Sequence, residues 1–493
     1  MSALASPFKP RGLRQWAMAS LIAATTLIAT SAHALPLFNR QTGQNCVACH
    51  AGGQFPELTP YGRLFKLTGY TIGQRTALPL SAMVVESMSS VANTFKSDNP
   101  SVDFARNDMA ILATGSLFAG GKITNNLGAF VQVTRDPFAT VNSTGGYQGK
   151  TKMDNADIRY ADRVVDGTND FIWGVSLNNN PSVSDPWNTA AAWMQYVPVP
   201  SPTSSSFIDG TAPYPSFGAG ANIAGLTAYG FLNQSWYGEA GLYKSATGAL
   251  HVMAAGLGAA DLTRLKGAAP YWRLAWNKQW DAYSLMLGAA GMHSKVYVNP
   301  LDMSDPNNTD RWHDLTLDAQ LQYLLDPHAF TAQLAIHRQR HGYPPSAANQ
   351  PSPFVDASGQ PLANSNSSDT ITQIRAKLSY VYQARYGTSL SLFTQNGTTN
   401  TANQTSGFDP TSMTITSDPN AGAPSTRVGG NLSGNPGVTG QTLEVFMMPI
   451  QYIRIGAQYT NYSRYNGASH NYDGFGRNAS DNNSIFVYLW GAY

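Results

Sequence analysis

The sequence predicts an all-β protein, an outer-membrane antiparallel β-barrel of about 16 strands preceded by a short, partly helical N-terminal segment. Three observations predict this fold: several segments alternate apolar and polar residues, the connections fall into two length classes, and only 12% of the 493 residues are charged. Soluble proteins usually carry about 25% charged residues. No apolar stretch after residue 34 is long enough for a transmembrane helix. Strands that span lipid have to close into a barrel, because lipid offers no partner to an open sheet edge.

The N-terminus has the pattern of an export signal. Three basic residues precede an apolar stretch at 17–32, and Ala32-His33-Ala34 supplies the small residues of a cleavage site. We therefore expect residues 1–34 to be a signal peptide. The apolar stretch is too short, and its flanks are wrong, for a membrane-spanning helix.

The alternation is clearest at 313–323, where every second residue from Leu315 to Tyr323 is apolar and the residues between them are polar. The segments 328–337, 371–382 and 452–460 alternate in the same way. A period of two with one apolar and one polar face indicates a sheet between unlike media. A soluble β-sandwich gives the same alternation, but strands of about ten residues bounded by aromatic residues favour a transmembrane barrel.

The connections between these segments are either short or long. Short turns that join two alternating segments lie near 119–125, 165–168, 232–233, 279–281, 325–327, 383–387 and 449–450. Longer stretches rich in Asn, Ser, Pro and Gly occupy 136–153, 179–220, 339–369, 397–440 and 463–483. With a first strand near 80–91 and a last strand at 484–493, we expect 80–493 to form the barrel, and 246–262 has room for one further hairpin. Short turns on one side and long loops on the other are typical of outer-membrane barrels whose two chain ends lie in the periplasm.

Residues 35–79 do not fit the barrel pattern and contain no convincing strand. Thr59-Pro60 has the form of an N-cap followed by proline at the first helical position, and Gly69 suits a helix end. We therefore expect a short helix at 60–68, within a small appendage at the periplasmic end of the barrel.

The chain has only two cysteines, and both lie in this appendage as Cys46-Val-Ala-Cys49-His50. This C-x-x-C-H spacing is that of a c-type haem attachment site. The two thiols would bind one porphyrin covalently and His50 would be the axial ligand of its iron, which makes 35–79 a monohaem c-type cytochrome segment. A Cys46–Cys49 disulfide is an alternative. A zinc site would need two further ligands that nearby Cys or His residues do not supply, and a thioredoxin-like redox pair would need a βαβ unit.

The sixth ligand of such a haem iron is open. Met83 falls on the same face of the first strand as Ser81 and Ser87, which we predict to be the lumen face, whereas Met88 falls on the opposite face. Methionine ligation would raise the reduction potential. Met83 is therefore one candidate, beside Lys66, a barrel histidine or an open position; a methionine on a strand is more often a packing residue.

Some charged residues are predicted to line the lumen or its outer rim. Asp157, Arg159 and Arg163 fall on one face of a predicted strand, as expected of a charged pore lining. His313, His337 and His341 fall near the outer ends of adjacent strands: either a transient iron entry site or, more simply, scattered rim histidines. The formal net charge of +2 gives no argument for nucleic acid binding.

Four stretches resemble the outer-membrane monohaem cytochrome–porin fusions of iron-oxidising bacteria. They are FNRQTGQNCVACH, FPELTPYGRLFKLTGY at 55–70, LNNNPSVSDPWNT at 177–189 and YDGFGRNASDNNSIFVYLWGAY at 472–493. The resemblance covers the signal, the haem segment, one early loop and the C-terminal strand, and the rest of the barrel matches by pattern only.

The resemblance implies a single-haem Fe(II) oxidase in the outer membrane, with Cys46, Cys49 and His50 at its redox centre. Extracellular Fe(II) would give one electron, and a periplasmic small cytochrome c or a copper protein would accept it. One cofactor cannot cross a hydrocarbon layer of about 30 Å by successive hops, so we expect 35–79 to fold up into the barrel from the periplasmic side.

Three other functions fit the sequence. The first is an electron conduit for another donor, such as a small organic reductant, a sulfur species or a solid surface. The second is a diffusion porin whose haem segment is structural or sensory. The third is a soluble periplasmic β-protein.

Overall fold

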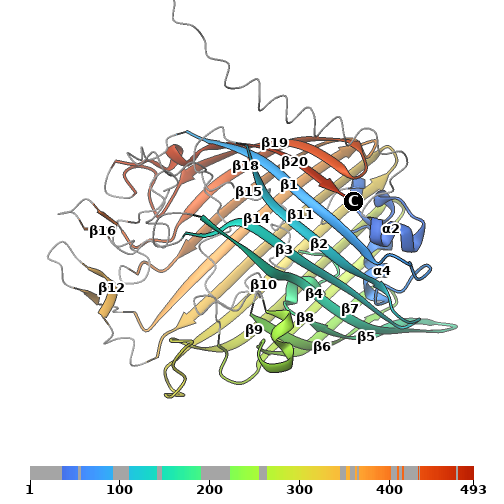
Figure 1. The fold of residues 1–493 in the computed structure, drawn as a ribbon, viewed down its shortest axis with the longest axis horizontal. Coiled ribbons are helices and arrows are strands. Elements are labelled where there is room, and N and C mark those ends of the chain that lie inside the picture. Colours follow the sequence, from blue (N-terminus) through green and yellow to red (C-terminus); the bar gives the residue numbers. More distant parts are fainter. Residues whose placement is uncertain are drawn as a thin grey trace, which may run out of the picture.

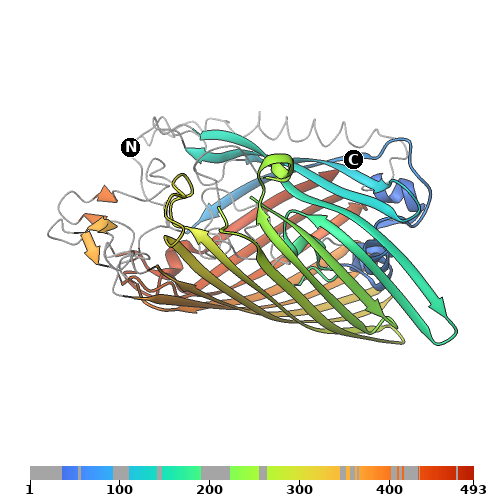
Figure 2. The same ribbon diagram turned by 90° about the horizontal axis from the view of Figure 1, so that it is seen from below.

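In the computed structural model, the described residues form a closed β-barrel with a small helical segment inside its mouth (Figure 1, Figure 2). The structure describes residues 36–53, 57–92, 110–141, 147–189, 222–254, 264–344, 351–355, 361–363, 366–400, 408–409, 414–415, 431, 433–472 and 476–493. The predicted signal peptide at 1–34 lies outside this part of the chain.

Sixteen antiparallel strands close the barrel within the described residues, as the sequence predicted. Each strand pairs with the next barrel strand along the chain, and β20 closes the ring on β1. The barrel strands are β1 (Leu80–Val91), β2 (Ala110–Lys122), β3 (Leu127–Val141), β4 (Tyr147–Asp166), β5 (Asn169–Asn178), β6 (Ile223–Leu232), β7 (Trp236–Ser245), β8 (Ala269–Trp280), β9 (Tyr283–Tyr297), β10 (Thr309–Leu325), β11 (His328–Gly342), β14 (Ser368–Tyr382), β15 (Tyr386–Gly397), β18 (Val438–Ile450), β19 (Ile453–Arg464) and β20 (Ser484–Ala492).

The apolar face of these strands points out of the barrel and the polar face points into it. On β10, Leu315 and Leu317 are half-exposed on the outside, whereas Thr316 and Asp318 are buried inside. This arrangement inverts that of a soluble protein, because the outer surface is suited to lipid and the inner one is not. The alternation predicted for 313–323 is therefore confirmed, and the barrel has the outer-membrane form.

An aromatic girdle lies on the outside of β9, β10, β11 and β14 near the short turns. The ring of Tyr323 lies 4.8 Å from that of Tyr283 and 6.2 Å from that of Phe330, and Phe330 lies 4.5 Å from Tyr380. Such girdles mark the level at which the hydrocarbon layer meets water. The short turns therefore project just beyond one membrane boundary.

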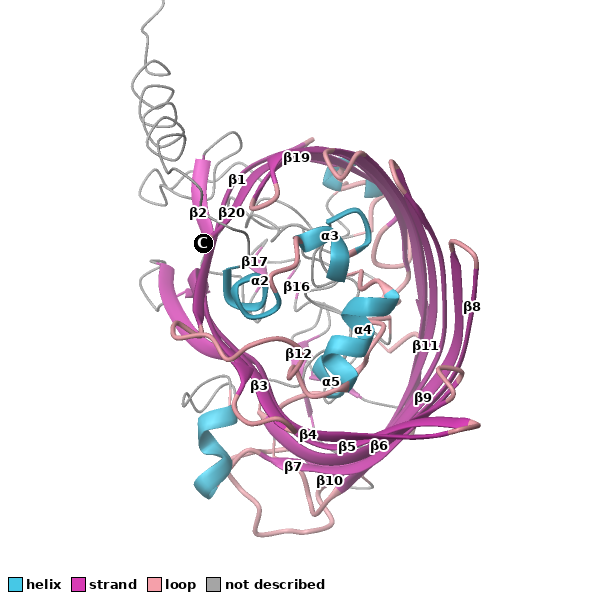
Figure 3. Ribbon diagram, turned by 90° about the vertical axis from the view of Figure 1, so that its right-hand side faces the viewer, coloured by secondary structure: helices cyan, strands magenta, loops and turns pink. Residues whose placement is uncertain are grey.

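The N-terminal segment lies within the ring of strands at this turn end (Figure 3). It consists of α2 (Pro36–Thr42), α3 (Cys46–Cys49), the 3-10 turn η1 (Ala51–Gly53) and α4 (Pro60–Leu67). The predicted N-cap is present, since the Thr59 hydroxyl accepts a hydrogen bond from the Gly62 amide, and Gly69 follows the helix at a φ of 71°. We call residues 36–79 the plug.

A second segment also folds into the barrel. Residues 179–189, which follow β5 and include α5 (Pro181–Ser184), are buried except for a partly exposed Asn188. The Trp187 ring packs edge-on against Tyr237, with 5.4 Å between centroids. We call residues 179–189 the inward loop. The sequence analysis predicted that this stretch begins the outer loop at 179–220. It did not predict that the stretch folds into the barrel.

Other loop predictions need correction. Most of 136–153 is strand rather than loop, because β3 and β4 continue well beyond the apolar alternation. Between 246 and 262 the described residues hold η2 (Gly248–Met253) and no hairpin. Smaller elements in the remaining loops are β12 (Pro351–Val355), β13 (Pro361–Ala363), β16 (Phe408–Asp409), β17 (Thr414–Ile415) and η6 (Ala479–Asn482). No helix in the described part of the chain is both long and apolar enough to cross a membrane.

Candidate functional site

The two cysteines and the histidine form one compact turn inside the barrel mouth. Cys46–Cys49 is a single helical turn, and the His50 amide closes it with a 2.8 Å hydrogen bond to the Cys46 carbonyl. Both cysteines are free thiols, and Cys46 is buried while Cys49 is partly buried. We call residues 46–50 the CxxCH turn. One helical turn brings both thiols and the adjacent imidazole to one small region of the chain.

The chain folds back on the CxxCH turn and fixes its shape. The backbone of His50 pairs with that of Leu58, and the Thr59 amide donates to the Cys49 carbonyl at 2.9 Å. Helix α4 then packs so closely that a β-carbon on Gly62 would overlap the Cys49 carbonyl oxygen. Only glycine permits this approach between α3 and α4.

Burial sets the protonation state of the turn. It raises the pKa of Cys46 and of Cys49 to about 11, with the neighbouring Cys49 adding to the effect at Cys46. It lowers the pKa of His50 to about 3. Near neutral pH the imidazole is therefore uncharged, which is the form that binds metal ions.

The thiols and the imidazole of the CxxCH turn are chemically suited to a c-type haem. Two unpaired thiols two residues apart and a neutral imidazole directly behind them are the groups that such a haem uses. Among the described residues, no group of three or more His, Cys, Asp or Glu side chains is arranged to hold a separate metal ion.

The candidates for a sixth ligand lie in different places. Met83 is on the lumen face of β1, as predicted, and packs against the cluster of Val85, Phe486 and Tyr488. The amine of Lys66 donates to the Asp185 carbonyl at 2.7 Å. A methionine that the sequence did not single out, Met448 on β18, lies beside the plug: a β-carbon on Gly53 would be 3.9 Å from its Cε. Met448 comes near the plug because the barrel closes and brings β18 beside residues 51–53. A sequence analysis could have included Met448 only by considering the lumen-facing methionines of every barrel strand.

One set of polar contacts attaches the start of α4 and the segment before it to the barrel wall. Arg63 donates to Gln322 at 2.9 Å and to the Ser284 hydroxyl at 2.7 Å. Lys377 forms a 2.6 Å ion pair with Glu57, whose side chain is fully buried. These contacts come from β9, β10 and β14, on one side of the ring.

A second set lies deeper, where the plug meets β4 and the inward loop. Arg159 pairs with Asp157 at 2.8 Å with both side chains fully buried. Asp157 also accepts a 2.6 Å hydrogen bond from the Tyr70 hydroxyl, and Arg159 donates to the Lys66 carbonyl and to the Ser184 carbonyl. The predicted lumen position of Asp157 and Arg159 is therefore right, and the two residues bind the plug.

The inward loop is in turn fixed to another part of the wall, at β8 and β10, by Arg273. The Arg273 guanidinium pairs with Asp185 at 3.2 Å and with Asp318 at 2.7 Å. Since the Lys66 amine also contacts Asp185 and Asn188, the plug, the inward loop and both parts of the wall share one buried polar layer. The third residue predicted for the lining, Arg163, lies outside this layer and forms a partly exposed ion pair with Asp170 near the hairpin tip.

The three histidines predicted near the outer rim do not form one site. His337 faces the lumen and pairs with Asp314 at 2.9 Å, and His341 pairs with Asp310 at 2.8 Å. His313 points out of the barrel and stacks on His293, with 4.2 Å between ring centroids. The structure thus separates His313 from the other two by the barrel wall.

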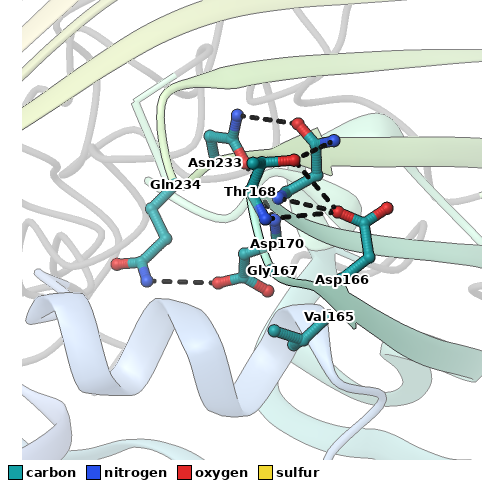
Figure 4. A pocket seen from close by; sticks show the side chains of 8 residues that line it. Val165, Asp166, Gly167, Thr168, Asp170, Asn233 and Gln234 are labelled. Atoms are coloured by element: carbon teal, nitrogen blue, oxygen red, sulfur yellow. Dashed lines mark hydrogen bonds between the residues drawn. The ribbon is translucent and has the colours of Figure 1, made fainter.

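A hollow at the turn end is formed by the tips of two hairpins (Figure 4). Its polar groups bind one another: the Gln234 side chain donates to Asp170 at 3.2 Å, and the Asn169 backbone N–H donates to the Asp166 carboxylate at 3.0 Å. We regard this hollow as turn structure rather than as a binding site.

No family model and no curated protein matches the chain. Among solved structures, it is similar to the outer membrane channel DcaP of Acinetobacter baumannii, at 11% identity and a TM-score of 0.40, over 84% of this chain and 96% of that one. It is similar to Salmonella typhi OmpF in complex with daunomycin at 12% identity and a TM-score of 0.41, over 84% and 97%. It is also similar to an anion-selective porin from Comamonas acidovorans at 10% identity and a TM-score of 0.38, over 84% and 98%. At such identities the similarity concerns the fold and not the activity.

Proposed function

We propose that this protein is an outer-membrane c-type cytochrome whose plug binds one covalent haem through Cys46, Cys49 and His50. It would take single electrons from extracellular Fe(II) and pass them to a periplasmic electron carrier. The observation that carries the proposal is the position of the CxxCH turn, which lies inside the barrel mouth and brings both thiols and the imidazole together within one helical turn.

The residues of the site have separate tasks in this proposal. The two thiols would hold the haem covalently, and the neutral imidazole of His50 would ligate its iron. A haem bound there would supply a one-electron redox centre. The buried contacts of Arg63, Glu57 and Arg159 keep the CxxCH turn in one position, and a site that is held in place needs little rearrangement when a charge arrives.

Two carboxylate–imidazole pairs lie on the lumen wall beyond the plug. Asp310 and Asp314 face the lumen in the outer half of β10, beside His341 and His337. Oxygen and imidazole groups are ligands that suit divalent iron. Fe(II) as the donor follows from the family resemblance, as does a small cytochrome c or a copper protein as the acceptor.

The test uses the full-length protein, produced with cytochrome c maturation and folded in detergent. We expect a haem that stays attached under denaturation and that Fe(II) reduces stoichiometrically without oxygen. His50→Ala should keep the attachment but change the absorption spectrum and abolish rapid reduction. His328→Ala, a histidine exposed at the turn end, is the control. If dithionite reduced the haem and Fe(II) did not, the donor would be wrong; a chain without haem would contradict the whole proposal.

A diffusion porin is the second candidate, and the polar lumen wall favours it. Uncharged polar groups on that wall include the side chains of Gln333, Gln339, Gln373 and Gln395. This function predicts steady ion conductance in planar bilayers and a haem, if bound, that does not turn over with the donor.

A further inference from the structure

The outer surface of β9, β10 and β11 carries four exposed cations close to the loop end of the barrel. We call Lys295, Arg311, Arg338 and Arg340 the basic patch. Their alternate neighbours Trp312 and Asp314 are buried on the lumen side, so the patch belongs to the outward face.

Strand register brings these cations together in adjacent rows. Lys295 lies directly opposite Arg311, and in the next row His313 lies between His293 and Arg340. In the third row Arg338 lies opposite Leu315. Neighbouring strands are about 4.8 Å apart and every second residue is about 6.7 Å further along, so the four charges share a surface of about 10 by 14 Å.

The patch lies at the membrane boundary opposite the aromatic girdle. On β10, His313 is ten residues from the girdle residue Tyr323. At about 3.3 Å per residue and a tilt of about 40°, this separation is about 25 Å along the membrane normal, which is the height of the apolar band in such barrels.

The neighbouring residues are those expected at this boundary of the membrane. Between the girdle and the patch the outward positions are apolar, including Leu317 and Leu334. Trp272 lies opposite Gly291 in the same row as Leu315 and Arg338, and tryptophan is enriched at membrane interfaces.

Among the described residues, the outward strand positions next to the patch carry no acidic residue. On β14, the strand next to Arg338 and Arg340, they are Ser368, Thr370 and Thr372. The Arg340 guanidinium donates to the Ser368 hydroxyl at 3.4 Å. Four cations that face the headgroup layer without a carboxylate among them fit an anionic ligand supplied by the membrane.

We propose that the basic patch binds the phosphate groups of lipopolysaccharide in the outer leaflet. Short turns lie on the periplasmic side of such barrels, so the patch faces the outer leaflet, where lipid A presents its phosphates at this level. Arginine binds phosphate through paired N–H groups, and the apolar surface below the patch receives the acyl chains. The binding is independent of the haem segment, on the other face of the wall.

The test measures the affinity of the full-length, detergent-folded protein for bisphosphorylated lipid A by native mass spectrometry. We expect the double variant Arg338→Gln/Arg340→Gln to bind at least tenfold more weakly. Lys278→Gln, which removes an exposed outward-facing lysine at the turn end of β8, is the matched control and should bind as the unaltered protein does. Heat-dependent migration in SDS gels verifies that each variant is folded.

Two further lipids separate the sources of phosphate. Lipid A without its phosphates should bind to the unaltered protein at least as weakly as lipid A binds to the double variant. Equal lipid A affinity in the double variant and the unaltered protein would overturn the proposal. The proposal would also be overturned if phosphatidylglycerol bound as tightly as lipid A and the double variant weakened both to the same extent. The patch would then bind any anionic headgroup.

Discussion

Arg159 is fully buried, and its guanidinium contacts polar and aromatic groups. Asp157 pairs with it, the Lys66 carbonyl accepts from it, and the ring of Tyr229 lies 4.9 Å from the guanidinium carbon. A buried ion pair adds little net stability, but the loss of one partner leaves an uncompensated charge. Arg159 therefore makes plug docking depend on Asp157.

Asp157→Asn should loosen the plug. The change removes the charge partner of Arg159 and weakens the bond to the Tyr70 hydroxyl, and we expect a cost of about 3–5 kcal/mol. Hydrogen exchange of residues 57–70 in the folded protein measures the result. Asp170→Asn is the control, because its ion pair with Arg163 is partly exposed and contributes less than about 1 kcal/mol. Equal protection in both variants would show that the ion pair does not hold the plug.

At the residue scale, the sequence predicted which face of the barrel wall a side chain lies on better than it predicted which residues that side chain contacts. Alternation correctly placed Asp157 and Arg159 on the lumen face, because a strand face follows from a period of two. Their contacts with Tyr70 and Lys66 could not be predicted, since nothing in the spacing of residues shows where a plug without strands will lie. The same limit hid Met448, which is far from the CxxCH turn along the chain.

At the element scale, the contact between α3 and α4 depends on Gly62. Gly62→Ala raises the intrinsic helix propensity by about 1 kcal/mol, so a purely local effect would stabilise the plug. The added methyl group would overlap the Cys49 carbonyl oxygen, and we expect a net loss of about 1–3 kcal/mol from overpacking. This loss is measured as the denaturant concentration at which residues 36–79 become susceptible to a protease.

Gly167→Ala is the matched control for this prediction. A β-carbon at Gly167, in the tip of the β4–β5 hairpin, would have no neighbour within 4 Å. It should leave plug resistance unchanged. Greater resistance in Gly62→Ala than in the unaltered protein would mean that α3 and α4 do not pack as described.

The elements themselves were predictable where they cross the membrane. The apolar and polar alternation located the strands that face lipid, and the capping pattern at Thr59 located α4. The loop-side extensions of β3 and β4 were missed because both faces of a strand outside the membrane meet water and lose their alternation. The inward loop was missed for a related reason, since a polar stretch suits a polar lumen as well as solvent.

At the scale of the whole molecule, the plug and the inward loop both occupy the barrel interior. Deletion of residues 36–75 should increase single-channel conductance in planar bilayers several-fold, because only the inward loop would then remain inside a barrel wide enough for an aqueous channel. The deletion ends before β1, so all barrel strands remain. Unchanged conductance would mean that the plug does not limit the pore.

Cys46 lies beneath the β18–β19 turn. Its amide donates to the Gln451 side chain at 3.4 Å, across a separation of 405 residues. These partners can meet only when nearly the whole chain has been exported and the last strands have formed. If the proposed haem is bound, an enzyme that attaches it needs open access to both thiols. The proposal therefore predicts that attachment precedes closure of the barrel, because the β18–β19 turn would otherwise restrict access to Cys46.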